Sequence, residues 1–304
     1  MDRRNFIAAG IATGVAMGNV VSTSNAKETQ GSSRKPFKLK YAPNLNGFKN
    51  LAPGDLIDRI QFIHDQGFRA IFDNGLMNKP ESLQKQIASK LQKLGMDLGP
   101  FVGYASFKER SFVLPPNKIK DDLVKAANKW VEVRKTTGAK QVLVVPGRYD
   151  ERLEWDYQTA NVIENLKYCA EICRKAGLVI VIEPLNPHNH PGLFLTKIPQ
   201  SYQICRAVND PSCKIVNDLY HQQITEGNLI PNIDRAWSEI AAFHLGDNPG
   251  RKEPGTGEIN YKNIFKHLSK KGYDGVLCME HGNSIKGKEG ELALIQAYRD
   301  SDSF

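Results

Sequence analysis

Four short apolar runs in this chain each end on a side chain that can bind a metal ion. These end residues are Glu183, Asp218, His244 and Glu280. Continuous apolar runs of this length, rich in β-branched residues, are typical of strands buried on both faces of a parallel sheet. Barrel enzymes keep their chemistry at the carboxyl ends of such strands. Three carboxylates and one imidazole meeting there predict a site for one divalent cation, and Mn²⁺, Mg²⁺ or Co²⁺ suits this ligand set.

Further polar residues follow these runs closely in the sequence. Pro184 stands directly after Glu183, and a proline there ends the strand so that the carboxylate sits at its tip. Asp218 opens Asp-Leu-Tyr-His, which puts His221 in the loop expected after that strand. His244 opens an eight-residue stretch that ends on Arg251, and we expect this arginine to reach back over the site.

The elements that must position these residues alternate along the whole chain. Apolar runs predict strands at 38–43, 69–73, 96–102, 140–145, 178–183, 213–218, 240–244 and 275–280. Helical periodicity predicts helices at 54–66, 80–94, 118–137, 157–176, 198–208, 230–238, 260–271 and 288–299. Eight strands alternating with eight helices predict an α/β fold, a (β/α)8 TIM barrel with a parallel eight-stranded barrel and outer helices. A doubly wound open sheet is the rival fold, but no GxGxxG follows the first strand.

The N-terminal stretch has the features of an export signal. Arg3 and Arg4 precede an uncharged segment and a small-residue cleavage site, which predicts a twin-arginine signal over 1–26. A polar linker is expected at 27–36 and a single barrel domain at 37–304. The expected partners therefore include the twin-arginine export machinery, and the expected location is the periplasm.

Cysteine content and charge exclude several classes of protein. The five cysteines form neither an even disulfide set nor a zinc-type CxxC pair, and we interpret them as small core residues. The formal net charge is +8, but the lysines are scattered along the predicted helices, with no basic block or aromatic RNA-binding motif. We therefore expect no nucleic-acid partner. The positive excess mildly favours an anionic substrate.

Longer motifs in the second half of the chain resemble the xylose isomerase-like TIM-barrel superfamily, and within it the hydroxypyruvate isomerases most closely. They are Ile182 to Asn186, Pro191 to Leu195, Asp218 to Ile224, Pro249 to Tyr261 and Gly272 to Gly275. The resemblance runs from about Lys38 to the last helix. It implies that Glu183, Asp218, His244 and Glu280 are the metal ligands. Hydroxypyruvate isomerases generally carry Gln in place of His244, whereas ketose 3-epimerases and inosose-processing relatives have His there, so the resemblance implies the site more specifically than the substrate.

The resemblance also implies a reaction, a proton transfer between adjacent carbons through a cis-enediolate. Glu183 and Glu280 would be the catalytic pair that removes and returns the proton. A keto-acid substrate needs a cationic partner for its carboxylate, with Arg251 as the first candidate and Arg148, at the end of the fourth strand, as the second. His221 would polarise or orient a substrate oxygen.

Three other functions are compatible with parts of this pattern. A ketose 3-epimerase or related sugar isomerase would use the same metal and glutamates on a longer polyol. An endonuclease IV-like phosphodiesterase shares the barrel but needs more histidine ligands, and the chain has seven histidines in all. An exported sugar-binding barrel without turnover would not need two carboxylates facing one metal. A homo-oligomer is possible for each of them.

Overall fold

The computed structural model describes residues 34–304 of the chain, and its strands follow the predicted order. They are β1 (Lys40–Pro43), β2 (Ala70–Ile71), β3 (Asp97–Leu98), β4 (Phe101–Ala105), β5 (Gln141–Val145), β6 (Val179–Ile182), β7 (Cys213–Asp218), β8 (Ile240–Leu245) and β9 (Val276–Met279). The export signal predicted at 1–26, and most of the linker predicted at 27–36, lie outside the described residues.

Helices connect these strands in sequence. They are α1 (Leu56–Asp65), α2 (Glu81–Leu94), α3 (Pro116–Thr137), α4 (Trp155–Lys175), α5 (Ile198–Val208), α6 (Leu219–Thr225), α7 (Leu229–Ala236), α8 (Tyr261–Lys270) and α9 (Gly287–Ser301), with short 3₁₀ turns η1 (Leu76–Asn78) and η2 (Trp237–Glu239). The start of α1 agrees with its sequence signal, because the Asp55 carboxylate accepts the N–H groups of Ile57 and Asp58. In the described part of the chain, no helix has the length and apolar character needed to cross a membrane.

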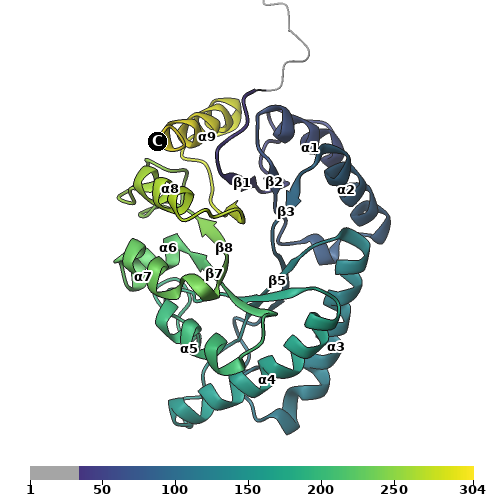
Figure 1. Cartoon of the computed structure of the whole chain (residues 1–304), viewed down its shortest axis with the longest axis vertical. Coiled ribbons are helices and arrows are strands. Elements are labelled where there is room, and N and C mark those ends of the chain that lie inside the picture. Colours follow the sequence, from purple (N-terminus) through teal and green to yellow (C-terminus); the bar gives the residue numbers. More distant parts are fainter. Residues whose placement is uncertain (1–33) are drawn as a thin grey trace, which may run out of the picture. The chain divides into compact units, whose positions relative to one another are not determined.

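A curled parallel sheet forms the centre of the described chain, and the helices lie around its outside (Figure 1). Seven strands pair in the order β1-β9-β8-β7-β6-β5-β4. Residues along each strand alternate between two cores: Val142 and Val144 belong to the large cluster that includes helix residues, and Leu143 and Val145 to a second, smaller cluster. Burial on both faces explains why the strands read as unbroken apolar runs.

Strands β2 and β3 form a separate parallel pair beside the two edges of the seven-stranded sheet. A parallel bridge joins Asn44, just after β1, to Phe72, just after β2. On the other side, the Val102 N–H of β4 donates to the carbonyl of Asn74 at 3.2 Å. The fold is therefore that of a TIM-barrel relative with a seven-stranded curled sheet, and full closure as an eight-stranded barrel stays a prediction.

Two local predictions differ from the structure. The strand predicted at 96–102 is divided into β3 and β4 at Gly99 and Pro100, because proline has no N–H to donate to a neighbouring strand. The segment after Asp218 was expected to be a loop and instead forms the short helix α6. The Asp218 carboxylate caps this helix by accepting the N–H groups of Tyr220 and His221.

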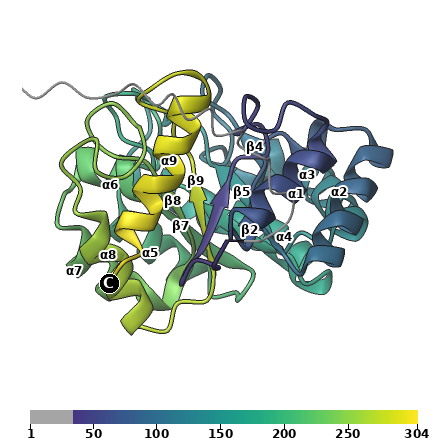
Figure 2. The same cartoon turned by 90° about the horizontal axis from the view of Figure 1, so that it is seen from above.

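The C-terminal helix covers the first strand of the sheet. Figure 2 shows α9 on the outer side of the sheet, next to β9. Tyr298 of α9 packs edge-on against Tyr41 of β1, with 5.0 Å between the ring centres. The Tyr41 hydroxyl donates to the Asp302 carboxylate at 3.0 Å, just after α9. These contacts join the two ends of the described chain around the buried sheet.

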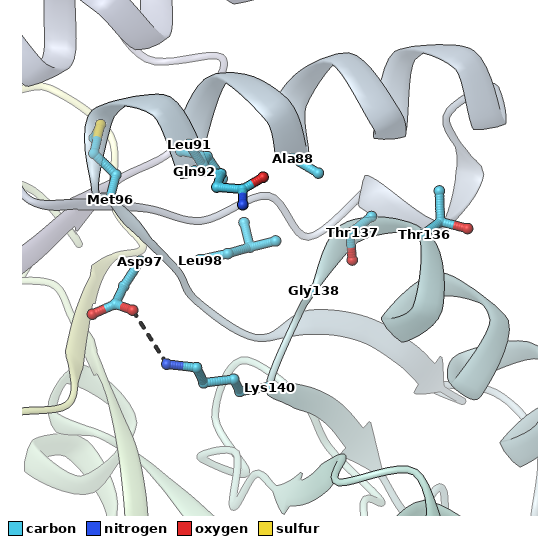
Figure 3. Close-up of a pocket in the computed structure, with 10 residues that line it drawn as sticks. All are labelled: Ala88, Leu91, Gln92, Met96, Asp97, Leu98, Thr136, Thr137, Gly138 and Lys140. Carbon is cyan, nitrogen blue, oxygen red and sulfur yellow. Dashed lines mark hydrogen bonds and ion pairs between the residues drawn. The ribbon is translucent and has the colours of Figure 1, made fainter.

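The cavity in Figure 3 lies at the end of the sheet where the strands begin. It has a volume of about 360 Å³ and is lined by residues of α2 and β3 and by the turn between α3 and β5. Its charged side chains, Asp97 and Lys140, form an ion pair at 3.5 Å. The side chains predicted to be functional stand at the opposite, carboxyl ends of the strands, so this cavity is not part of that site.

Candidate metal centre

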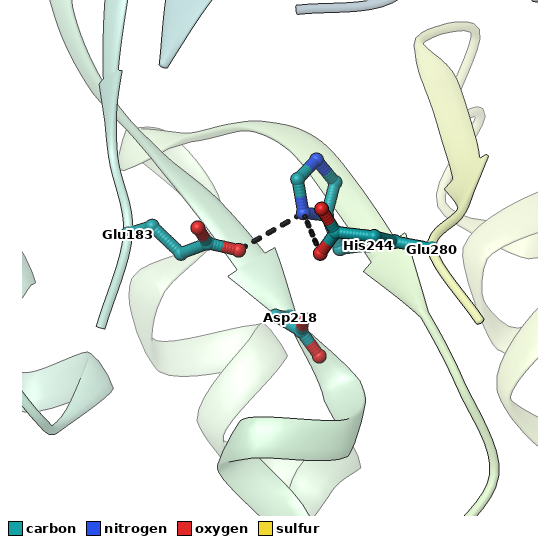
Figure 4. Close-up of side chains that lie close together, drawn as sticks. All are labelled: Glu183, Asp218, His244 and Glu280. Carbon is teal, nitrogen blue, oxygen red and sulfur yellow. Dashed lines mark hydrogen bonds and ion pairs between the residues drawn. The ribbon is translucent and has the colours of Figure 1, made fainter. Parts of the chain in front are cut away.

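The four side chains predicted as metal ligands come together at the carboxyl ends of four neighbouring strands (Figure 4). Glu183 directly follows β6, Asp218 is the last residue of β7, His244 lies near the end of β8, and Glu280 directly follows β9. The sheet register aligns them, because Asp218 pairs with His244 across β7 and β8. One ligand atom from each residue lies within 4.8 Å of the other three.

The imidazole of His244 stands between the two glutamates. Its Nδ1 lies 2.9 Å from Glu183 Oε1 and 3.1 Å from Glu280 Oε2. His244, Asp218 and Glu183 are buried, with at most 4% of each residue exposed, and the Glu280 side chain is 21% exposed. The two carboxylates therefore converge on one nitrogen from different strands.

This crowding shifts the pKa values of the two glutamates in opposite directions. Burial raises the pKa of Glu183 to about 7, and the nearby carboxylates of Glu280 and Asp218 add to the increase against the opposing effect of His244. Burial also opposes ionisation of Glu280, but the charges of His244 and Arg251 outweigh it and hold the pKa of Glu280 well below its usual value. A pair of carboxyl groups with pKa values pushed apart is suited to acid–base chemistry.

The donor set fits a divalent cation. Three carboxylates meet here, and without an ion they are balanced by Arg251 and by a protonated His244: burial opposes that charge, but Glu280 and Glu183 raise the pKa of His244 well above its usual value. Buried carboxylates are costly unless they are paired or bind a metal. A divalent ion would replace the imidazole proton and leave His244 free to act as a ligand. Oxygen ligands with one imidazole suit Mn²⁺, Mg²⁺ or Co²⁺.

Arg251 reaches this cluster from the loop after β8, as its position in the sequence predicted. Its Nη2 donates to Asp218 Oδ2 at 3.1 Å and to Glu280 Oε2 at 2.7 Å, and its Nε donates to the Glu280 carbonyl at 3.1 Å. The residue has φ of 52°, a left-handed conformation that is uncommon outside glycine. Its guanidinium also lies over the Tyr220 ring, 5.0 Å from the ring centre.

A buried aspartate holds the Arg251 loop in shape. The Asp247 carboxylate is fully buried and accepts the N–H groups of Asn248, Gly255, Gly257 and Ile259. A Cβ on Gly257 would lie 2.2 Å from the carbonyl oxygen of Asn248, so glycine is needed for this close approach. The long motif around Thr256 therefore forms one loop whose backbone N–H groups surround the Asp247 carboxylate.

His221 also borders the cluster, but from a helix rather than the expected loop. It lies in the first turn of α6, and its Nε2 is 3.6 Å from Asp218 Oδ2. Burial lowers the pKa of His221 to about 4, so the ring is neutral near pH 7. Its Nδ1 faces Asn186, three residues after Glu183.

Arg148, the second candidate for a substrate carboxylate, is engaged elsewhere. Its Nη1 donates to the carbonyl of Pro191 at 2.9 Å, and its backbone pairs with Leu193 in an isolated bridge. The guanidinium therefore joins the loop after β5 to the loop after β6. Among the described residues, Arg251 is the arginine that forms ion pairs with members of the cluster.

Three residues that contact members of this region were not predicted to be functional. Asn74 follows β2 and donates from Nδ2 to Glu280 Oε1 at 2.5 Å. Asn186 contacts His221, and Asp247 organises the Arg251 loop. Asn74 stands just after a predicted strand, in the same position relative to its strand as the metal-competent residues, and that position could have identified it. The position of Asn186, three residues after its predicted strand, gives no such indication of its hydrogen bond to His221.

Comparison with known proteins places this geometry in context. The sequence model of the xylose isomerase-like TIM barrel matches residues 60–299. The chain is 31% identical to a hydroxypyruvate isomerase of Escherichia coli, over 86% of this chain and 100% of that one. It is 26% identical to a 2-oxo-tetronate isomerase of Cupriavidus necator, over 85% and 98%. It shares the fold of 3-keto-D-glucoside 4-epimerase from E. coli at a TM-score of 0.70, with 18% identity over 88% and 100%.

Proposed function

The chain belongs to the xylose isomerase-like TIM-barrel family, and we propose that within it the chain is a metal-dependent isomerase of small keto acids, with hydroxypyruvate as substrate and tartronate semialdehyde as product. The family is enzymatic, and the curated relatives are named isomerases, so the chain is an enzyme of the isomerase type. The choice of a keto acid is supported by both relatives, whose names refer to keto-acid substrates.

The observation that carries the proposal is the convergence of Glu183 and Glu280 on His244 Nδ1, at 2.9 and 3.1 Å. Two carboxylates that approach one point from β6 and β9 can act on the two adjacent carbons of a small molecule held between them. A bound divalent cation would supply Lewis-acid polarisation of the substrate carbonyl at this place. The rest of the chemistry belongs to the protein side chains.

In this mechanism one glutamate removes the proton from C3 of hydroxypyruvate, and the C3–H electron pair forms the C2–C3 double bond of an enediolate. Protonation at C2 by the other glutamate then gives tartronate semialdehyde, while the hydroxyl proton of O3 moves to O2. The first glutamate then passes its proton to the second through solvent, so atoms and charge balance over the cycle without an added oxidant or reductant. A positioned base or acid of this kind contributes about 10²–10⁴-fold to the rate.

Arg251 and His221 are proposed to bind the oxygen atoms of the substrate. The Arg251 guanidinium lies at the cluster, partly exposed, where it can pair with the carboxylate of a keto acid. Neutral His221 lies near the same Asp218 oxygen as Arg251, with its Nε2 3.6 Å from Oδ2, and can contact the carbonyl or hydroxyl oxygen. Arg148 stays a weaker candidate, because its guanidinium bonds Pro191.

Ketose 3-epimerisation is the second candidate function, and His244 is the observation that favours it. Epimerases of this superfamily resemble the chain at this position, whereas hydroxypyruvate isomerases generally carry Gln. The same two glutamates would then remove and return a proton at one carbon, from opposite faces. A trinuclear phosphodiesterase has less support, since among residues 34–304 a single cluster of three or more potential metal ligands is found.

Solvent deuterium separates these candidates in one experiment. We expect purified protein with Mn²⁺ in D₂O to convert hydroxypyruvate to tartronate semialdehyde that carries deuterium at C2, as detected by NMR after the metal is removed. Free ketoses serve as the comparison set. Exchange at C3 of a ketose, with hydroxypyruvate unchanged, would replace the keto-acid proposal with the epimerase. No exchange on any of them would contradict both.

We also propose that the chain is exported through the twin-arginine route and acts in the periplasm. Changing Arg3 and Arg4 together to lysine keeps the charge but removes the paired guanidinium groups. We expect processed protein to disappear from the periplasmic fraction and the precursor to accumulate in the cytoplasm, as measured by immunoblotting. A matched variant with Lys27 changed to arginine should be exported normally. Unchanged export of the double-lysine variant would indicate another route.

A further inference from the structure

Within residues 34–304, the buried imidazole of His221 has one hydrogen-bonded nitrogen, Nδ1, and one nitrogen without a hydrogen bond, Nε2, which lies 3.6 Å from Asp218 Oδ2. The residue is 1% exposed. Its Nδ1 lies 3.2 Å from the backbone nitrogen of Asn186 and 2.7 Å from Asn186 Nδ2. Its Nε2 is buried and has no hydrogen-bond partner in the described chain. A buried polar atom without a hydrogen-bond partner lowers the free energy of unfolding, so we expect a bound ligand to supply the missing partner of Nε2.

The position of the proton on the His221 ring follows from neighbouring groups that can act only as donors or only as acceptors. A backbone N–H can only donate, so Nδ1, which faces the Asn186 N–H, must be the acceptor. A neutral imidazole with Nδ1 as acceptor carries its proton on Nε2. The amide orientation of Asn186 is fixed in the same way, because its Oδ1 accepts the backbone N–H of Asn189 at 2.9 Å. Its Nδ2 is therefore the end that faces His221.

The surroundings hold this arrangement rigidly. Asn186 is fully buried, and its Nδ2 also donates to Asn189 Oδ1 at 2.9 Å. The Tyr220 hydroxyl donates to the same oxygen at 3.1 Å. The rings of Tyr220 and His190 pack on two sides of His221, at 5.3 and 5.4 Å between ring centres.

We propose that Asn186 is a positioning residue that holds His221 as an Nε2–H donor aimed at the cluster. This inference rests on the proposed function, in which a carbonyl or enediolate oxygen of the substrate lies beside Asp218. A protonated Nε2 has no lone pair for a cation, so His221 is a hydrogen-bond donor to the substrate oxygen and not a fifth metal ligand. The loop after β6 thus supplies both a proposed acid–base group, Glu183, and the residue that orients the donor.

The wild-type protein tests this assignment directly by NMR. In protein labelled with ¹⁵N-histidine and loaded with Mg²⁺ near pH 7, we expect the His221 ring to show a lone-pair Nδ1 and a protonated Nε2. The His221 signals are identified by their absence in His221→Gln. A proton on Nδ1, or an Nε2 bound to magnesium, would overturn the inference. This readout needs neither a substrate nor turnover.

An isosteric change at Asn186 tests whether its side chain sets the tautomer. Asn186→Asp places a carboxylate oxygen where the amide nitrogen stood, 2.7 Å from Nδ1, and this charged acceptor outweighs the backbone N–H at 3.2 Å. We therefore expect Nδ1 to become protonated at the same pH and kcat to fall by about 10- to 100-fold with little change in KM. Asn189→Asp is the matched control, since it adds the same charge to the same loop while keeping the acceptor for Tyr220. Its His221 spectrum should match the wild type.

The possible outcomes separate the inference from the proposed function. An unprotonated Nδ1 in Asn186→Asp would refute the role of the side chain, and if that variant does not fold, the wild-type spectrum alone decides the tautomer. The expected wild-type spectrum together with no deuterium exchange on any keto acid or ketose would remove the proposed function and leave the tautomer assignment standing.

Discussion

Purified protein should hold one divalent cation per chain, and Asp218→Ala and His244→Ala should each lose it. Both side chains are almost fully buried and belong to the four-residue cluster. Changing groups that only support a metal ligand typically costs 10–100-fold in affinity, so loss of a ligand itself should weaken binding by more than about 100-fold. Elemental analysis after dialysis, together with calorimetric titration of Mn²⁺, measures both quantities.

Two further variants distinguish loss of the metal from loss of the fold. Asp218 also caps α6, so Asp218→Asn should keep much of the cap, remove the charge and still lose metal. His267 makes an imidazole–carboxylate contact of 2.9 Å with Asp234 outside the cluster, the same length as the contact between His244 and Glu183. His267→Ala should retain the cation. Normal metal content in both Asp218→Ala and His244→Ala would show that the ligand assignment is wrong.

The four-residue cluster could be predicted from the sequence because strand ends can be located from hydrophobic patterning. The run before Glu183 is apolar on every residue, and the run before Asp218 keeps an apolar centre at Ile215 and Val216, since β6 and β7 are buried on both faces. Parallel pairing then aligns their carboxyl ends without any knowledge of the side-chain packing. Four such ends with compatible ligands were therefore enough to predict which residues would meet.

The features that the sequence did not predict depend on short secondary-structure elements and on individual hydrogen bonds. Helix α6 has seven residues, too few for a periodic pattern, and its capping residue is itself one of the cluster carboxylates. Asn186 acts through bonds to His221, and Asp247 acts through bonds to the backbone of the loop that follows it. No hydrophobic periodicity encodes such bonds. The division between β3 and β4 is a different case, because Gly99 and Pro100 were visible as strand-breaking residues.

The two glutamates are the residues whose change should affect turnover most. We expect Glu183→Gln and Glu280→Gln each to lower kcat by roughly 10² or more at saturating metal, because an amide keeps the shape and one oxygen but cannot accept a proton. Glu280→Gln carries an additional penalty. Arg251 Nη2 and Asn74 Nδ2 both donate to this carboxylate, so the new NH₂ group would face one of two donors.

The double variant distinguishes a shared mechanism from two separate defects. If both glutamates serve one enediolate, either change already breaks the cycle, and the two losses should not multiply. Glu291→Gln is the matched control: Glu291 is 2% exposed and accepts bonds from Asn50 and Leu51, outside the cluster, so kcat should stay at the wild-type value. Thermal unfolding would verify that each variant is folded. A folded, metal-loaded double variant with intact turnover would rule out proton transfer by this pair and require a base elsewhere.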